Sequence, residues 1–347
     1  MRLEHYMKER MLAKNDKCIL GYQKGCLIVR DSQNKKIIKT NRIHNRIKSV
    51  KWFERLLRYE PRIAISVDDM VFWYTDHGAI YEYRIEENIV KKIRSFSKGM
   101  NNPLSFCVRR DNDGRVKEVV YGEYIWNTEK GKVSIFRYDF KGWKEVYSFP
   151  EKTITHIHNI IYDSYKNRYI VMTGDDDSES AIWDIDEEFK EIHKIVGGSQ
   201  KYRACMALPN SDGIYYATDT PLEENRLYFY DYKNGLKEIC SMPGPCIYGR
   251  VYNNILYLAT SVEGNPALGK WRYRMSNKLG KGVRDRKVHI FSCDIYGNVQ
   301  EIGYMIKDKL PMWLFQFGNA LFPESTEGIF VCPQSCKEKG TLKVIEV

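Results

Sequence analysis

The sequence has no apolar run of the roughly 18 residues that a membrane-spanning helix needs, so no such helix is expected. Residues 1–17 lack the apolar core of an export signal, and we therefore expect a cytoplasmic protein. Phosphate-binding glycine loops, dinucleotide-binding glycine patterns and nucleophile-elbow motifs are also missing. These absences argue against the common nucleotide-binding and α/β-hydrolase classes.

Cysteine is present, but not in the pattern of a disulfide framework. The nine cysteines are an odd number and are scattered through strand-like segments, which favours reduced core residues. Cys332 and Cys336 are spaced like half of a metal site, but no second pair of ligands accompanies them. No metal site is expected there.

What the sequence does contain is a repeat, which is clearest in residues 155–195. This stretch has four short runs rich in β-branched and aromatic residues, HNIIYD, RYIVMTG, SAIWDI and FKEIHKI, separated by turn-forming clusters. Degenerate copies occur on both sides, and the second run of each copy ends in an acid: Asp76, Glu123, Asp175, Asp219 and Glu263. A period of roughly 40–50 residues made of four short strands is typical of a β-propeller.

The repeat predicts an all-β fold in which residues 1–347 form a single β-propeller of four-stranded antiparallel blades. Seven hairpins indicate seven blades, or six if the two ends of the chain share one blade. The first unit begins without its first strand, and the last unit stops before its fourth. We therefore expect a strand from residues 1–16 to complete the last blade and close the ring.

Two segments depart from the repeat. Residues 42–62 are basic, and we expect a surface connection there, with a short helix or a ragged first strand as alternatives. Residues 263–287 form a long basic loop in the sixth blade, where Trp271 and Tyr273 alternate with lysine and arginine. Such a loop is either solvated or clamps a polyanion. A nucleic-acid partner is not favoured, because most aromatic residues occupy strand positions.

Propeller geometry brings two kinds of connection to one face of the ring. The link between successive blades and the link between the second and third strands of a blade open on the same side, around the central channel. The candidate catalytic residues on that face are His156, His158, Tyr202, Tyr248, Asp175 and Asp219. The candidate substrate-binding residues are Asn159, Arg203, Arg250, Glu263 and Gln316.

Structural roles are open for several of these residues. His156 and His158 alternate along a strand and are expected on opposite faces, where either could hydrogen-bond between blades. Arg203 and Arg250 could form ion pairs with Asp175 or Asp219. The residue types differ from blade to blade, which favours function over architecture.

Two chemistries fit the candidate set, so whether the protein is an enzyme stays open. Two acids about 5–10 Å apart could hydrolyse a glycosidic bond. A histidine, a tyrosine and an arginine could instead perform β-elimination at a uronic acid. No cofactor and no metal ligand are assigned. The stretch Asp175–Glu179 could bind Ca²⁺, but it lacks the glycine and final glutamate of an EF-hand loop, so a hydrated acidic turn is preferred.

The chain also resembles known propellers. Ser66, Asp68 and Trp73 match part of the sialidase Asp-box, and Ser292, Asp294 and Gly297 match it a second time in degenerate form. The layout resembles sialidase-like repeat proteins and propeller polysaccharide lyases, of the kind that accompany bacterial surface-polysaccharide enzymes. The lyase resemblance implies His156 or His158 as base, Tyr202 or Tyr248 as acid, and Arg203 or Arg250 as the neutraliser of a carboxylate.

The resulting hypothesis is a carbohydrate-active propeller. It would bind an anionic glycan or polysaccharide intermediate at the central channel, and as an enzyme it would be a glycoside hydrolase or a polysaccharide lyase. The alternative is a non-catalytic propeller scaffold for protein–protein interaction, with a protein as the partner.

Overall fold

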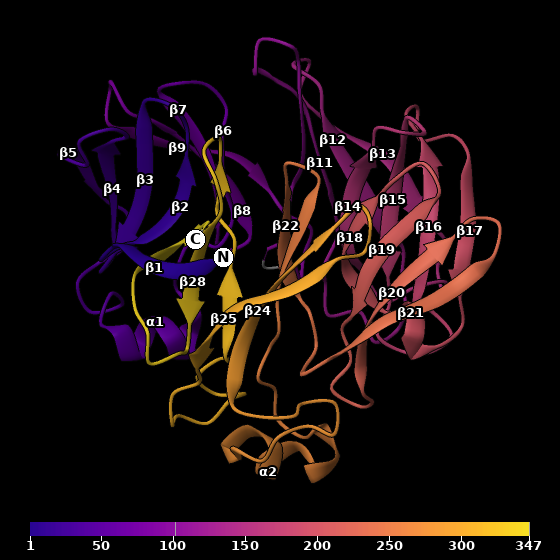
Figure 1. The fold of residues 1–347 in the computed structure, drawn as a ribbon. Helices are drawn as coiled ribbons and strands as arrows, with labels where there is room; N and C mark the ends of the chain where they lie inside the picture. The colour runs from indigo at the N-terminus through magenta and orange to yellow at the C-terminus, as the bar shows by residue number, and fades with distance from the viewer. Residues whose placement is uncertain (101, 347) are drawn as a thin grey trace.

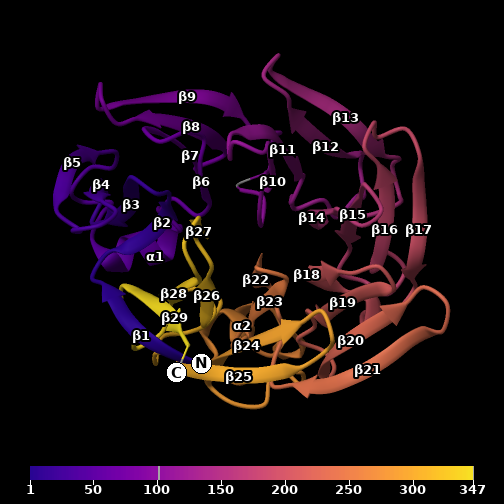
Figure 2. The same cartoon turned by 45° about the horizontal axis from the view of Figure 1, so that its top comes forward.

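The computed structural model describes residues 1–100 and 102–346, with residue 270 described by its backbone only. Seven antiparallel sheets stand around a central axis, as Figure 2 shows most clearly. The seven-bladed propeller predicted from the repeat is confirmed.

The blades are named here in chain order with the bounds of their strands. Blade one contains β2 (Arg10–Lys14), β3 (Cys18–Gln23), β4 (Cys26–Asp31) and β5 (Ile37–Arg42), and blade two contains β6 (Ala64–Ser66), β7 (Val71–Asp76), β8 (Ala79–Arg84) and β9 (Ile89–Ser95). Blade three contains β10 (Cys107–Arg110), β11 (Val116–Gly122), β12 (Val133–Tyr138) and β13 (Trp143–Phe149), and blade four contains β14 (Ile157–Asp163), β15 (Arg168–Thr173), β16 (Ala181–Asp186) and β17 (Ile192–Gly197). Blade five contains β18 (Ala204–Pro209), β19 (Gly213–Thr218), β20 (Asn225–Asp231) and β21 (Gly235–Met242), and blade six contains β22 (Tyr248–Tyr252), β23 (Ile255–Ala259), β24 (Lys287–Asp294) and β25 (Val299–Ile306). Blade seven contains β26 (Asn319–Leu321), β28 (Phe330–Gln334), β29 (Thr341–Ile345) and β1 (Arg2–Met7).

The core lies between the blades rather than within one of them. A separate cluster of buried side chains fills each of the seven blade interfaces. Tyrosines such as Tyr74, Tyr121, Tyr169 and Tyr216 are at most 1% exposed there, which explains how a tyrosine-rich chain builds a core. All nine cysteines are free and seven are buried, as expected for reduced core residues.

The ring closes through the N-terminal strand, as predicted. β1 pairs antiparallel with β29, from Arg2 opposite Ile345 to Met7 opposite Thr341. The first strand of blade one, β2, was not recognised in the sequence, because RMLAK contains no β-branched or aromatic residue. A second seam forms where β27 (Glu324–Ser325) pairs in parallel with β2.

The segment expected to be a surface connection contains a helix, so the preferred expectation was wrong and the short-helix alternative holds. α1 (Lys51–Leu57) ends at Arg58, whose φ of 54° is left-handed. In the long loop of blade six, η2 (Pro266–Leu268) and α2 (Lys270–Met275) lie at the same end of the ring as α1 (Figure 1). Within the described residues, no helix has the length and apolar character needed to cross a membrane.

Candidate functional site

Blade four brings two histidines together at one mouth of the ring. His156 Nε2 and His158 Nε2 are 3.1 Å apart, and the ring centroids are 5.0 Å apart. The expectation that the two side chains point to opposite faces was wrong. The pairing register between β14 and β15 shifts between Ile157 and Asn159, and this bulge breaks the strict alternation of the strand.

Asp175 completes the group from the far end of β15. Its carboxylate lies 3.2 Å from His158 Nε2 and 3.5 Å from His156 Nε2. Arg203, which precedes β18, approaches the same carboxylate to 2.9 Å. Burial opposes ionisation, but the contacts with the two imidazoles and the charge of Arg203 outweigh it, so the pKa of Asp175 lies well below its usual range.

The hydrogen-bond pattern of His158 is informative. Its Nδ1 lies 3.0 Å from the backbone carbonyl of Ala204 and must donate to it. In the neutral ring, Nε2 then carries no proton, and its lone pair faces His156 Nε2 and the carboxylate of Asp175. A lone pair facing a carboxylate is unfavourable unless a proton or a cation lies between them.

The distances suit a divalent metal ion. Ligand atoms bonded to one ion at about 2.1 Å lie about 3.0–3.4 Å from each other, and the three separations here are 3.1, 3.2 and 3.5 Å. A metal-bound histidine usually donates its other N–H to a carbonyl, as His158 does. His156, His158 and Asp175 could therefore hold an ion such as Zn²⁺ or Mn²⁺, whereas the sequence analysis assigned them no metal.

Two further acids stand behind this group, at the ends of the second strands of blades five and six. Asp219 lies 3.8 Å from Arg203 Nη2 and accepts from Cys205 Sγ at 3.3 Å. Glu263 accepts from the Ser261 hydroxyl at 2.5 Å. Burial, followed by the charge of Asp219, raises the pKa of Glu263 to about 7.

Three residues near the site were not among the predicted site residues. The ring of Tyr124 lies 4.5 Å from that of His156, and burial followed by the charge of Asp175 raises the pKa of Tyr124 well above its usual value. Tyr273 of α2 covers Gly264, and Arg58 lies within electrostatic range of Tyr124 and Tyr273. Arg58 and Tyr273 lie in the two segments that depart from the repeat, whereas Tyr124 directly follows Glu123 at the end of a second strand.

The central channel contains a cavity of about 590 Å³ walled by the first strands of the blades. Four arginines line it, Arg62, Arg109, Arg110 and Arg250, with Glu324 as the one acidic lining residue. Arg110 pairs with Glu324 at 2.7 Å, and Arg109 pairs with acids behind the wall.

The other two arginines of the channel are short of partners. Among the described residues, neither Arg62 nor Arg250 has a carboxylate within ion-pair distance, and Arg250 Nε is buried without a hydrogen bond. The nearest acceptor of Arg250 is the carbonyl of Ser325 at 3.4 Å. Burial lowers the pKa of Arg250, and the charge of Glu324 opposes that shift.

The predicted residues thus fall into four places. Six lie in the cluster at the mouth of the ring: His156, His158, Asp175, Arg203, Asp219 and Glu263. Asn159, Tyr248 and Arg250 line the channel cavity. Tyr202 packs among the hydrophobic residues between blades four and five, and Gln316 lines a separate cavity beside α1, where its amide donates to the carbonyl of Arg55 at 3.3 Å.

The two terminal carboxylates of the acidic stretch 175–179 have separate partners. Asp175 faces the histidines, whereas Glu179 is buried and accepts from the Thr155 hydroxyl at 2.8 Å. Lys130 adds an ion pair to Glu179 at 3.3 Å.

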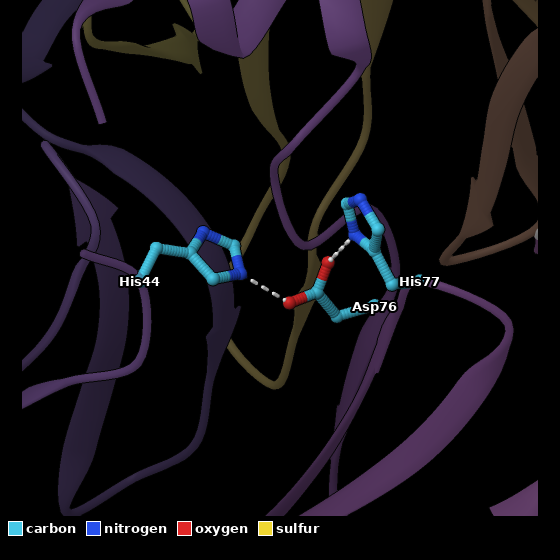
Figure 3. Close-up of side chains that lie close together, drawn as sticks. All are labelled: His44, Asp76 and His77. Atoms are coloured by element: carbon cyan, nitrogen blue, oxygen red, sulfur yellow. Dashed lines mark hydrogen bonds and ion pairs between the residues drawn. The ribbon is translucent and has the colours of Figure 1, made fainter. Parts of the chain in front are cut away.

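A second histidine group lies between blades one and two. Figure 3 shows the carboxylate of Asp76 between two imidazoles, with His44 Nε2 at 2.6 Å and His77 Nδ1 at 2.7 Å. These separations are those of hydrogen bonds and are shorter than the spacing of about 3.0–3.4 Å between ligands of one metal ion. Tyr22 extends the chain, because its hydroxyl lies 3.1 Å from His44 Nδ1 and donates to Glu54 of α1 at 2.7 Å. The group therefore anchors α1 to the ring.

Fold and geometry define a seven-bladed β-propeller with a polar cluster at one channel mouth. No protein-family model matches the chain, and no curated protein matches its sequence. Among solved structures, a chain of the mitotic checkpoint complex aligns over 99% of this chain and 95% of its own length, with a TM-score of 0.54 and 9% identity. An oligogalacturonate lyase from Vibrio parahaemolyticus aligns over 98% of this chain and 91% of its own, with a TM-score of 0.51 and 11% identity. At such identities these likenesses show the fold alone.

Proposed function

We propose that the protein binds an oligosaccharide containing uronic acids in its central channel and cleaves it by β-elimination at the mouth. The observation that carries the proposal is the channel cavity of about 590 Å³, in which Arg62 and Arg250 have no carboxylate partner among the described residues. A half-buried guanidinium without a carboxylate partner is poorly compensated, and an anionic ligand would supply the missing charge.

The cluster at the mouth supplies groups suited to elimination. A divalent ion held by His156, His158 and Asp175 would neutralise the uronate carboxylate and so acidify the proton at C5. The carboxylate of Glu263, whose pKa is about 7, is the base best matched to accept that proton near neutral pH.

Tyr124 is the proton donor in this scheme. A tyrosine phenol is protonated at neutral pH, so it can deliver a proton to the departing oxygen at C4. Glu263 gains one proton, Tyr124 loses one, and the sugar acquires a C4–C5 double bond. Hydrolysis by a pair of carboxylates is disfavoured, because Arg203 lies between Asp175 and Asp219 and holds both in its field.

Activity on uronate oligomers tests this scheme. We expect the wild type to produce unsaturated sugars, detected by ultraviolet absorbance, from oligogalacturonate or a similar polyuronate, and not from neutral oligomers of equal length. Tyr124→Phe and Glu263→Gln should each lower kcat by roughly 100-fold or more. Glu188→Gln, at an exposed acid, is the matched control. No product from any polyuronate, with or without added Mn²⁺ or Zn²⁺, would remove the lyase assignment.

A non-catalytic scaffold is the second candidate. Ile47, Trp52 and Leu57 around α1 are 73%, 50% and 51% exposed, and an exposed apolar group of this kind often marks a protein contact. Loss of a co-purifying partner on Trp52→Ala, combined with no glycan binding by the wild type, would favour that function. We also propose a cytoplasmic location, with which nine free cysteines agree.

A further inference from the structure

A second cavity lies at the seam where the ring closes. It has a volume of about 670 Å³ and is enclosed by α1, by the turn between β1 and β2, and by the connection between β28 and β29. Figure 1 shows α1 beside the strands that carry the two chain ends. The cavity is thus separate from both the central channel and the histidine cluster.

The lining of this seam cavity is strongly basic. Eight lysines and arginines face three acids, and each acid already has a partner. Glu60 pairs with Arg10 at 3.0 Å, Glu9 pairs with Arg30, and Glu54 accepts from Tyr22. The acids therefore leave most of the positive charge unbalanced.

Arg10 and Arg55 are the two basic lining residues with an ion pair of their own. The remaining six have no carboxylate within ion-pair distance in the part of the chain that the structure describes: Lys8, Lys24, Arg42, Arg46, Lys51 and Lys339. Lys51 and Lys339 come from opposite sides of the seam, and both line the cavity. Partial burial, followed by the nearby charges of Lys339 and Arg55, lowers the pKa of Lys51.

Like charges held together across a seam destabilise the empty protein. Such a group of like charges is expected in a binding site, because a ligand of opposite charge removes the repulsion when it binds. Lysine ammonium groups are common phosphate ligands, and a dianion can neutralise two of them at once.

We propose that the seam cavity is a binding site for the phosphate group of a small anionic ligand, held between Lys51 and Lys339. The volume is within the range of about 300–1,000 Å³ that small-molecule sites occupy, so a phosphate ester of modest size fits. The proposal does not depend on the glycan site, because the seam cavity and the channel cavity have no lining residue in common.

Calorimetric titration of the full-length protein with inorganic tripolyphosphate tests the site. We expect one ligand per chain, with an affinity that falls as salt is raised. Lys51→Ala combined with Lys339→Ala should weaken binding by at least roughly tenfold, whereas Lys51→Arg, which keeps the charge, should stay within about threefold. Lys233→Ala combined with Lys237→Ala in blade five is the matched control and should bind as the wild type does.

Thermal denaturation of the same variants separates ligand binding from a structural role. Removing the like charges should leave the Tm of the double variant unchanged or higher. Tripolyphosphate should raise the Tm of the wild type, of Lys51→Arg and of the control, but not that of the double variant. A double variant that is less stable than the control and binds tripolyphosphate as well as the wild type would overturn the proposal. So would a wild type that does not bind.

The source of the phosphate is decided by sedimentation with lipid vesicles. Phosphatidylcholine vesicles containing phosphatidic acid would carry the wild type down, and the double variant would stay in solution, if the ligand is a lipid headgroup. Binding of tripolyphosphate without vesicle binding assigns a soluble phosphate ester. Failure of both arms overturns the proposal and leaves the glycan proposal untouched.

Discussion

Glu263 offers the sharpest prediction about the site. The residue is 7% exposed, and burial followed by the charge of Asp219 raises its pKa from 4.5 to about 7, with Arg203 and Ser261 opposing the shift. A carboxyl group whose pKa is raised in the folded state takes up a proton on folding when the pH lies between the unfolded and the folded pKa, here between 4.5 and about 7. Its contribution to stability is therefore greatest below pH 4.5 and is lost as the pH rises to 7, after which it is constant.

The magnitude follows from the shift. A change from 4.5 to about 7 corresponds to about 3 kcal/mol of unfolding free energy lost across that range. Glu263→Gln cannot ionise at this position. Its unfolding free energy should therefore lose about 3 kcal/mol less than that of the wild type across the same pH range. Urea unfolding at pH 5, 6, 7 and 8 measures the difference, with exposed Glu188→Gln as the control. Equal slopes for the wild type and Glu263→Gln would refute the electrostatic account of the cluster.

Three more predictions concern the metal, a turn and the ring closure. The wild type should bind one Co²⁺ or Zn²⁺ per chain, and His158→Ala should weaken that binding by roughly 10- to 100-fold. His193→Ala, at an exposed histidine, is the control and should bind the metal as the wild type does. Equal affinities of His158→Ala and the wild type would contradict the ligand assignment. Gly174→Ala should lower the unfolding free energy by roughly 2–4 kcal/mol, because φ is 80° and the added Cβ would lie 2.3 Å from the Glu179 backbone; a wild-type urea midpoint would contradict this. Deleting residues 1–8 leaves β29 as an open edge and should lower Tm by roughly 5–10 °C; an unchanged Tm would show that β1 is dispensable.

The fold could be predicted from the sequence because every blade repeats the same local pattern. Tyr169 and its counterparts mark strands that are buried between blades, and turn clusters mark their ends. The first strand of blade one was hidden, since Met11 is buried against blade seven, which is distant in sequence, and Leu12 is buried against blade two. Local propensity carries no information about such a partner.

The site was predictable in part for the same reason. The acids at the ends of second strands, Asp175, Asp219 and Glu263, were expected to gather because the repeat fixes their position in each blade. The meeting of His156 and His158 depends on a bulge, which changes the side of the strand on which a residue lies and leaves no signal in the pattern. Tyr273 was noted only as part of the long basic loop, because a segment outside the repeat has no register that would place it beside Glu263.

The most direct test of the central claim is calorimetric titration with a uronic acid trimer and with its neutral counterpart. The account predicts that the wild type binds the uronate and not the neutral sugar. Arg62→Ala combined with Arg250→Ala should weaken binding by at least roughly 100-fold, while Arg226→Ala on the third strand of blade five has no effect. Binding that is indifferent to the substrate carboxylates or to the two channel arginines would contradict the account.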